Sequence, residues 1–536
     1  MPQAPHPAPS LFRAVTTVGG YTLLSRVTGF ARDVLQATFI GAGATADAFV
    51  IAFSFPNLFR SLFAEGAFSA AFVPIFAQIL EREGQSKAKQ FADDAFAVLG
   101  VVLLFFSIVM IIAMPLVIYV MAPGYADQPE QLADITELAR IAFPYLLFVS
   151  LTSLQSGVLN AMNRFAVAAA APILLNLTLI AALLAGVGAS ETEQGRAVFL
   201  AWGVFLAGIL QFIWLAIDCR RIGMRFKLVK PHLTPEVKQL MLRMVPVAFG
   251  AGVYQLNVVI NRSIASLVEE GAVSWLYYAD RVNLLPVGVI GVAVGVALLP
   301  LLTRQIQSGN EEAAMANQNR AIEISLLLTI PAAAGIAALA GPITATLFER
   351  GAFTPSDREA VAAALFAFSL GLPAYVLNKT LTPGFFGRHD TKTPVKASAF
   401  ALVINIILNL ALMDRFGHVG IALGTAISSW INVGILAVIL HKRGHLRADA
   451  RLKRRLPRTV LAAALMIAVL VGAVALATTY LGPVFGTHDA PAGHELLRAL
   501  TLAGIIGAGG LTFFIAALVL GAAQVSDLDS VRRKRA

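Results

Sequence analysis

Long apolar segments follow one another along almost the whole chain, separated by short polar connections. A helix needs about 20 mainly apolar residues to cross a bilayer. The segments that reach this length lie near residues 14–40, 46–79, 93–122, 138–160, 166–188, 197–217, 240–261, 273–303, 321–346, 360–386, 395–413, 419–440, 459–480 and 497–522. The pattern predicts an all-α integral membrane protein with about 14 transmembrane helices.

Composition agrees with this class. Hydrophobic residues make up 57% of the 536 residues and charged residues 13%, and the mean hydropathy is +0.75. These values exclude an ordinary soluble globular protein. The Pro-rich start lacks the charged region and cleavage site of a signal peptide, so we expect the first helix to be retained. The single Cys219 excludes an internal disulfide.

Lysine and arginine are concentrated in alternate connections. The segments 219–239 and 442–458 and the tail 526–536 are basic, whereas the connection 123–137 has no Lys or Arg. By the positive-inside rule both termini are cytoplasmic, which requires an even number of helices. Topology and anionic lipid headgroups therefore account for the net charge of +10, and we expect no nucleic-acid partner.

A faint internal repeat runs through the first twelve predicted helices. Pro74 and Pro300 end similar segments, and at the same offset the loop at Asn163 corresponds to the loop at His389. This predicts two six-helix lobes of parallel topology plus two C-terminal helices. The expected organisation is a cytoplasmic tail (1–13), an N-lobe (14–218), a basic cytoplasmic linker (219–239), a C-lobe (240–441), a basic cytoplasmic loop (442–458), helices 13 and 14 (459–525) and a basic tail (526–536).

Four arginines interrupt the apolar segments: Arg26, Arg32, Arg60 and Arg281. An arginine at the centre of a spanning helix costs roughly 2.5–3.5 kcal/mol, so it usually faces a polar cavity or a charged ligand. At 1.5 Å per residue, Arg26 and Arg60 lie roughly 21 Å below the outer surface, and the other two roughly 12 Å below it. We therefore predict a polar cavity for an anionic substrate.

The alternative is that these arginines only pair with nearby acids. Asp33 adjoins Arg32, and Asp280 adjoins Arg281. Asp47 is expected one helix away from Arg60. Adjacent residues on a helix point about 100° apart, so we expect Asp33 and Asp280 not simply to neutralise their neighbours.

An enzyme has little support from the sequence. The spanning segments contain no HExxH, GxSxG, P-loop or paired-acid motif. The chain is therefore expected to be a transporter rather than an enzyme, and one that ATP does not drive directly.

Four blocks identify a family resemblance. They are SRVTGFARD (25–33), ATADAFVIAFSFPNLFRSLFAEGAFSAAFVPIF (44–76), VSWLYYADRVNLLPVGVIGVAVGVALLP (273–300) and KTLTPGFFGRHDTKTPVK (379–396). They closely resemble the MurJ (MviN) family of lipid II flippases, within the multidrug/oligosaccharidyl-lipid/polysaccharide exporter superfamily. The resemblance implies fourteen helices, the bacterial inner membrane, and translocation of an undecaprenyl-pyrophosphate-linked peptidoglycan precursor by alternating access.

The resemblance also implies roles for individual residues. The family's cavity arginines, which bind the lipid pyrophosphate, correspond to Arg26, Arg60 and Arg281. Arg32 corresponds to a further essential arginine on the first helix. The other positions that the family uses around the cavity correspond to Asp47, Asn57 and Ser274. Helices 13 and 14 resemble the pair that forms a groove for the polyprenyl tail.

The chain departs from the family pattern at two places. Leu284 stands where some members carry a cavity glutamate. Some members bind sodium in the second lobe, but the corresponding residues here are Asn261, Asn405, Asn409 and Thr425, without a carboxylate. Hard cations prefer charged oxygen ligands, so we expect no cofactor and no firm sodium site. Membrane potential acting on the cavity arginines is an alternative driving force, and interhelical hydrogen bonding is the simpler explanation of the asparagines.

The sequence therefore predicts a flippase that moves lipid II from the cytoplasmic to the periplasmic leaflet for peptidoglycan synthesis. The alternatives are a flippase for another polyprenyl-pyrophosphate glycan and a cation-coupled drug exporter, the latter disfavoured by the basic residues. The expected partners are lipid II, membrane phospholipids, and cell-wall synthesis or division proteins.

Overall fold

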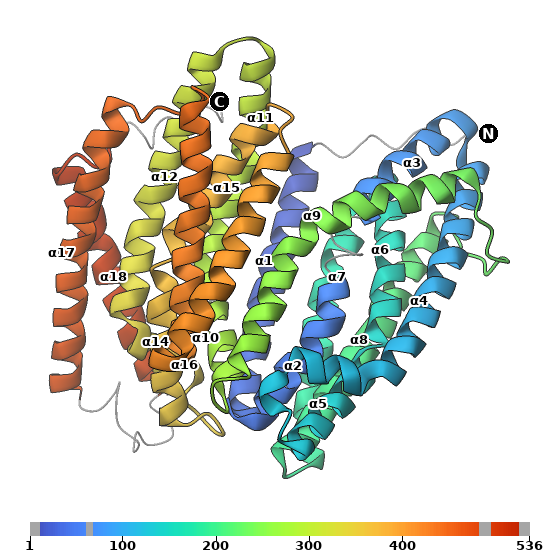
Figure 1. The fold of residues 1–536 in the computed structure, drawn as a ribbon, viewed down its shortest axis with the longest axis horizontal. Coiled ribbons are helices and arrows are strands. Elements are labelled where there is room, and N and C mark those ends of the chain that lie inside the picture. Colours follow the sequence, from blue (N-terminus) through green and yellow to red (C-terminus); the bar gives the residue numbers. More distant parts are fainter. Residues whose placement is uncertain (1–10, 61–67, 482–494, 525–536) are drawn as a thin grey trace. The chain divides into compact units, whose positions relative to one another are not determined.

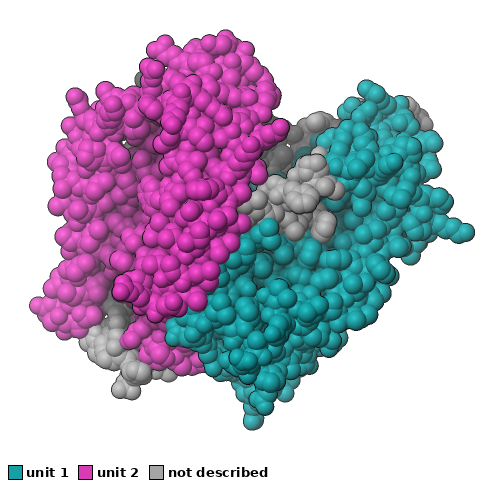
Figure 2. Space-filling model, in the orientation of Figure 1, with its two compact units in different colours: residues 1–273 teal, residues 274–536 magenta. Residues whose placement is uncertain are grey.

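The computed structural model describes residues 11–60, 68–481 and 495–524, which form helices and short connections without a strand. The predicted all-α fold class is confirmed. The chain forms two compact units, residues 1–273 and 274–536 (Figures 1 and 2). The predicted tail 526–536 and most of the predicted tail 1–13 lie outside the described residues.

The first unit is a set of packed helices. Its elements are α1 (Leu11–Ile40), α2 (Ala44–Phe59), α3 (Phe68–Glu83), α4 (Gln85–Met121), η2 (Pro123–Tyr125), α5 (Pro129–Ala142), α6 (Tyr145–Ala161), α7 (Phe165–Ala189), α8 (Glu193–Arg221) and α9 (Pro235–Ala265). Helix α9 packs against α2, α3 and α4 and so belongs to this unit, although it was predicted to begin the C-lobe. The predicted bounds of the two lobes, 14–218 and 240–441, stay a prediction.

The second unit continues from α10, which begins at the unit boundary. Its elements are α10 (Ala272–Pro286), the π-helix η3 (Val287–Gly291), α11 (Val292–Gln307), α12 (Glu311–Ala338), α13 (Ala340–Phe348), α14 (Pro355–Ser369), α15 (Leu372–Phe386), α16 (Lys392–Lys442), α17 (Ala450–Tyr480) and α18 (Glu495–Val519). Its largest apolar core joins α15 to α12, α16 and α17 through side chains such as Leu381, Phe385, Leu436 and Leu452.

Helix α16 is a hairpin of two spanning helices. Its 51 residues would extend to about 76 Å if straight, more than twice a bilayer core. The backbone reverses at Gly417, whose φ of 55° and ψ of −139° are not helical. An ion pair between Asp390 and Arg443 joins the two ends at 2.6 Å. The bonds from Arg443 and Thr393 hold the pKa of Asp390 well below its usual value, so the carboxylate stays charged.

The number of spans agrees with the prediction of about fourteen. Among the described residues, nine helical segments are long and apolar enough to cross a membrane, and Lys392–Lys442 supplies two of the passes. The other passes are α1 and α9, which carry charges, α2 with α3, and α10 with α11, which are joined by the π-helix η3. Charges lower the apolar signal of α1 and α9 without shortening their path across the bilayer.

The predicted internal repeat is visible in two turns. Asn163 and His389 are the non-glycine residues of the described chain with positive φ, 61° and 60°. In both turns the next backbone N–H donates to the carbonyl oxygen five residues earlier, at 2.8 Å and 3.1 Å. The same offset relates Pro74 in α3 to Pro300 in α11. Two turns with the same geometry at this one spacing agree with the predicted parallel repeat.

The basic segment 442–458 is a loop only in its first half. Asp449 accepts a hydrogen bond from the backbone of Leu452 at 2.7 Å and so caps α17, which begins at Ala450. Arg455 is buried there and pairs with Glu323 of α12. The prediction of a solvated loop up to residue 458 was therefore wrong, because the pattern of charges did not reveal the acid on another helix.

Candidate functional site: cations within the spanning helices

Arg26 lies on the exposed side of α1. Its apolar neighbours Leu23, Leu24 and Val27 are exposed as well. The other side of α1 packs closely on α7, where a side chain at Gly29 would come within 3.2 Å of Asn176. The cation is thus on the side of α1 that does not pack on α7, as binding of a ligand requires.

Arg32, in contrast, is buried in the contact between α1 and α7. It is 8% exposed, its Nη2 lies 2.5 Å from the Asp33 carboxylate, and its Nη1 donates to Asn176 at 3.1 Å. The expectation that adjacent side chains would not pair was wrong, because the long arginine side chain turns back to Asp33. These contacts hold α1 on α7, so Arg32 has a packing role, and its role in substrate binding stays a prediction.

Arg60 caps the C-terminus of α2. Its Nε donates to the side-chain oxygen of Asn57 at 2.9 Å. The preceding residue Phe59 packs on Phe106 and Phe143, with ring centroids 5.1 Å and 6.2 Å apart. Aromatic packing therefore fixes the residue before Arg60, and the predicted residues Asn57 and Arg60 are brought together.

Arg281 stacks on an aromatic ring of its own helix in the second unit. The guanidinium carbon lies 4.6 Å from the centre of the Tyr277 ring, on the preceding turn of α10. Such stacking suits a planar guanidinium better than an ammonium. Ser274 lies two turns before Arg281 and is fully buried.

Asp47 is a buried carboxylate at the N-terminal end of α2. It accepts hydrogen bonds from the Tyr125 hydroxyl at 2.7 Å and from the backbone of Gly271 at 2.8 Å. Burial, with the neighbouring Asp47 carboxylate, raises the pKa of Tyr125, so the hydroxyl keeps the proton that it donates. Arg60 is 13 residues further along, about 20 Å on a helix. Asp47 therefore joins connections on one side of the unit rather than neutralising Arg60.

The suspected sodium residues are bonded to one another in the α16 hairpin. The side-chain nitrogen of Asn405 lies 3.3 Å from the side-chain oxygens of both Asn409 and Thr425. Asn405 and Asn409 are fully buried, and Gly424 leaves the space that the Asn409 side chain fills. Asn261 belongs to α9 of the first unit and donates to Asn257 at 3.2 Å. These contacts support interhelical packing as the role of the amides in α16.

The comparisons with known proteins decide the family. The family described as "Lipid II flippase MurJ" matches residues 36–488. "Probable lipid II flippase MurJ" from Rhizobium tropici is 43% identical over 532 residues, covering 98% of this chain and 97% of that protein. "Lipid II flippase MurJ" from Burkholderia cenocepacia is 38% identical over 439 residues, covering 81% and 84%. The chain belongs to the lipid II flippase MurJ family.

Solved structures agree with this assignment. A lipid II flippase MurJ in an inward closed conformation matches with a TM-score of 0.75 and 25% identity, covering 94% of this chain and 98% of that one. An inward-facing multidrug resistance MATE family transporter of the MOP superfamily matches with a TM-score of 0.64 at 15% identity, covering 80% and 98%. The second match shows a shared fold alone. This MurJ family member is therefore a multi-pass membrane transporter and not an enzyme.

Two residues of the second unit of this MurJ family member lie close to the π-helix η3. Leu284, at the position of a glutamate in some members, packs with the apolar cluster around Val287, Leu372 and Val376. Lys379 of α15, which the sequence analysis passed over, is exposed, and its stem lies 3.0 Å from where a side chain at Gly291 would begin. Lys379 could have been singled out from the sequence, because it interrupts an apolar helix as the four arginines do.

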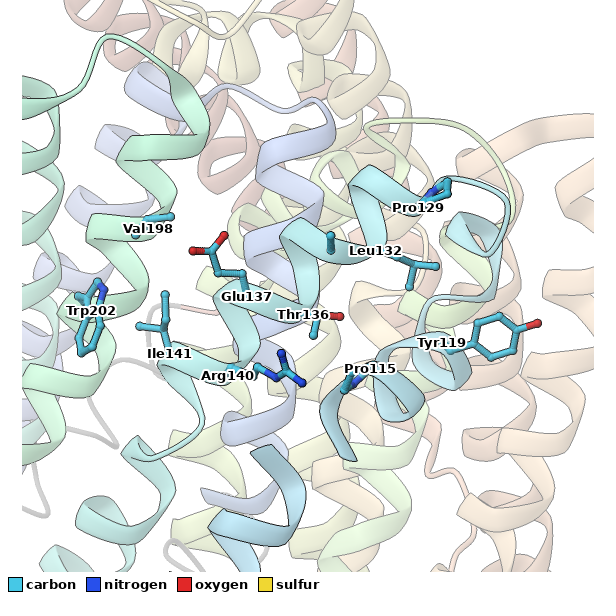
Figure 3. Close-up of a pocket in the computed structure, with 11 residues that line it drawn as sticks. Pro115, Tyr119, Pro129, Leu132, Thr136, Glu137, Arg140, Ile141, Val198 and Trp202 are labelled. Atoms are coloured by element: carbon cyan, nitrogen blue, oxygen red, sulfur yellow. The ribbon is translucent and has the colours of Figure 1, made fainter. Parts of the chain in front are cut away.

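Arg140 was missed for a different reason. Pro115 has no N–H, so the Ile111 carbonyl one turn earlier in α4 loses its helical donor. Arg140 of α5 supplies that donor, its Nε lying 3.1 Å from the Ile111 oxygen. Arg140 points toward the turn of α4 that carries Pro115, in a pocket of about 780 Å³ (Figure 3). The signal was a helical proline, but its partner could not be found without the packing of α4 on α5.

Proposed function

We propose that this chain flips lipid II, the undecaprenyl-pyrophosphate-linked peptidoglycan precursor, from the cytoplasmic to the periplasmic leaflet of the bacterial inner membrane. Its relatives bear this name and match it over nearly their whole length. The observation that carries the proposal beyond the family name is the placement of four arginines within apolar helices, since a cation in a spanning helix usually faces a polar cavity or a charged ligand.

In this proposal Arg26, Arg60 and Arg281 bind the pyrophosphate during alternating access. A guanidinium offers a planar pair of donors to phosphate oxygens. Asn57 fixes the direction of the Arg60 Nε, and the Tyr277 ring holds the Arg281 guanidinium over its face. Both neighbours act by positioning a guanidinium, which lowers the entropy cost of binding.

We also propose that both termini are cytoplasmic. The ends of the α16 hairpin support this orientation, because Arg388, Lys392, Lys442 and Arg443 gather where Asp390 joins the two ends. Basic connections remain on the cytoplasmic side of the inner membrane.

Complementation tests the function directly. A strain depleted of its own lipid II flippase should grow when it expresses this chain, because the chain would supply the missing translocation step. A second strain, lacking its flippase for an O-antigen unit, should not be rescued. Rescue of the second strain alone, with the protein present in both membranes, would favour another polyprenyl-pyrophosphate glycan as the substrate.

We further propose that the membrane potential, rather than sodium, drives the cycle. Asn405, Asn409 and Thr425 include no carboxylate that could bind sodium firmly. We expect flipping in sealed vesicles to persist when potassium replaces sodium and to fall when the membrane potential is collapsed. The potential acts on the cationic residues with about 2.3 kcal/mol per charge per 100 mV. Strict dependence on sodium would refute this expectation, and insensitivity to both would leave the lipid gradient as the driving force.

A further inference from the structure

An apolar groove on the first unit ends in two arginines. It has a volume of about 660 Å³ and lies between α4, α6, α8 and the segment that follows α8. Apolar side chains such as Val101, Leu104 and Phe212 line most of it, and Arg220 and Arg225 line its end. Both arginines are exposed. The groove thus combines a surface for hydrocarbon with two cations at one end.

A buried amide lies within this groove. Gln155 of α6 is fully buried and lines the groove, and neither its side-chain nitrogen nor its oxygen has a hydrogen-bond partner among the described residues. A buried amide without a partner is costly. Gln155 lies six residues before the end of α6, about 9 Å along the helix. Both amide atoms are inaccessible, so the lining that a ligand meets is apolar up to the two arginines.

The segment 225–229, which follows α8 and lines the groove, suits the membrane surface. The Phe226 ring packs on Phe96 of α4 with centroids 5.2 Å apart, and the Lys227 backbone donates to Asp93 at 3.0 Å. With these residues held, Leu228 is left 91% exposed. An exposed leucine among basic residues suits the headgroup region of a bilayer, where its side chain meets lipid rather than water.

The groove lining contains two arginines and no acidic residue, and two acids of the adjoining helices are paired with other cations. Asp218 of α8 lies 3.0 Å from Arg164 and 4.0 Å from Arg221, and Asp93 lies 2.5 Å from Lys89. The end of the groove therefore keeps a net positive charge.

We propose that this groove is a binding site for an anionic phospholipid. The phosphate lies at Arg220 and Arg225, and an acyl chain follows the apolar lining. Charge complementarity decides against a zwitterionic lipid. This lipid is a resident of the fold and not the transported substrate, since neither Arg26 nor Arg60 lines the groove.

Native mass spectrometry of the full-length protein in detergent tests the proposal, with dioleoyl phosphatidylglycerol and dioleoyl phosphatidylcholine as the two probes. We expect one tightly retained phosphatidylglycerol. Its preference over phosphatidylcholine should be roughly thirtyfold, because each interfacial cation contributes about fivefold. The double variant Arg220→Gln/Arg225→Gln should lose this preference.

Two further variants separate the site from general charge. Arg221→Gln is the matched control, because Arg221 is exposed beside Arg220 but does not line the groove, and it should retain the preference. Gly100→Phe should lower the retention of both lipids, because Gly100 lines the groove and a side chain there meets open space. Each variant must elute as the wild type does from size-exclusion chromatography.

Equal retention of the two lipids by the wild type would overturn the proposal. So would a double variant that keeps the preference, or a loss of preference in Arg221→Gln as large as in the double variant. None of these results depends on flipping, so the outcome is independent of the proposed function.

Discussion

Alanine at Arg26, Arg60 or Arg281 is expected to abolish complementation while the protein still reaches the membrane. Removing a charge-assisted hydrogen bond costs about 1.5–3 kcal/mol, or roughly ten- to a hundredfold in affinity at each position. Growth of the depleted strain and the amount of protein in the membrane fraction are the two measurements. The control is Arg304→Ala, since Arg304 is exposed at the end of α11, and it should complement.

Lysine at the same positions separates charge from geometry. We expect poor rescue, because an ammonium has no Nε to keep the bond from Arg60 to Asn57 and no planar pair of donors over Tyr277. Full growth of all three lysine variants would refute the paired-donor geometry but leave an anion site. Full growth of the alanine variants would refute the anion site itself.

The largest effect on stability is expected at Glu323 of α12. Its carboxylate lies 2.5 Å from Arg455 and 3.2 Å from Arg451 of α17, and it also pairs with Arg320. Glu323 and Arg455 are each only 6% exposed. Glu323→Ala leaves the Arg455 cation buried without this partner, which typically costs about 3–5 kcal/mol. We expect a lower Tm in detergent and less protein in the membrane.

The control for Glu323 is Glu359→Ala. Glu359 also pairs with an arginine, Arg358 at 3.0 Å, but its side chain is 76% exposed, and exposed pairs contribute about 0–1 kcal/mol. The double variant Glu323→Leu/Arg455→Leu should recover part of the lost stability, because neither charge is then left alone. Equal Tm values for Glu323→Ala and Glu359→Ala would contradict the buried network.

Helix order and the repeat could be predicted because both are local properties of the chain. A run of apolar residues fixes the length of a span, and the turns at Asn163 and His389 are fixed by their own neighbours. The π-helix η3 was not predicted, since it leaves an apolar run apolar.

Partners of charged residues could not be predicted in the same way. Arg32 bonds Asn176, which is 144 positions away, and Arg455 bonds Glu323, which is 132 positions away. Neither pair leaves a mark in the local pattern. The candidate arginines could be found because a cation in an apolar helix stands out in the sequence of that helix. The residues around it depend on which helices pack together.

The hydrogen bond from Arg140 to the Ile111 carbonyl makes two distant positions depend on each other. With Pro115 in α4, the arginine side chain takes the place of a missing peptide N–H. If another residue replaced Pro115, its own backbone N–H could donate to the Ile111 carbonyl. The hydrogen bond from Arg140 would then no longer be needed. Where Pro115 is kept, loss of Arg140 exposes a bare carbonyl to lipid. During divergence the two residues are therefore constrained as a pair, and the order in which they can change is set: the proline must be replaced first.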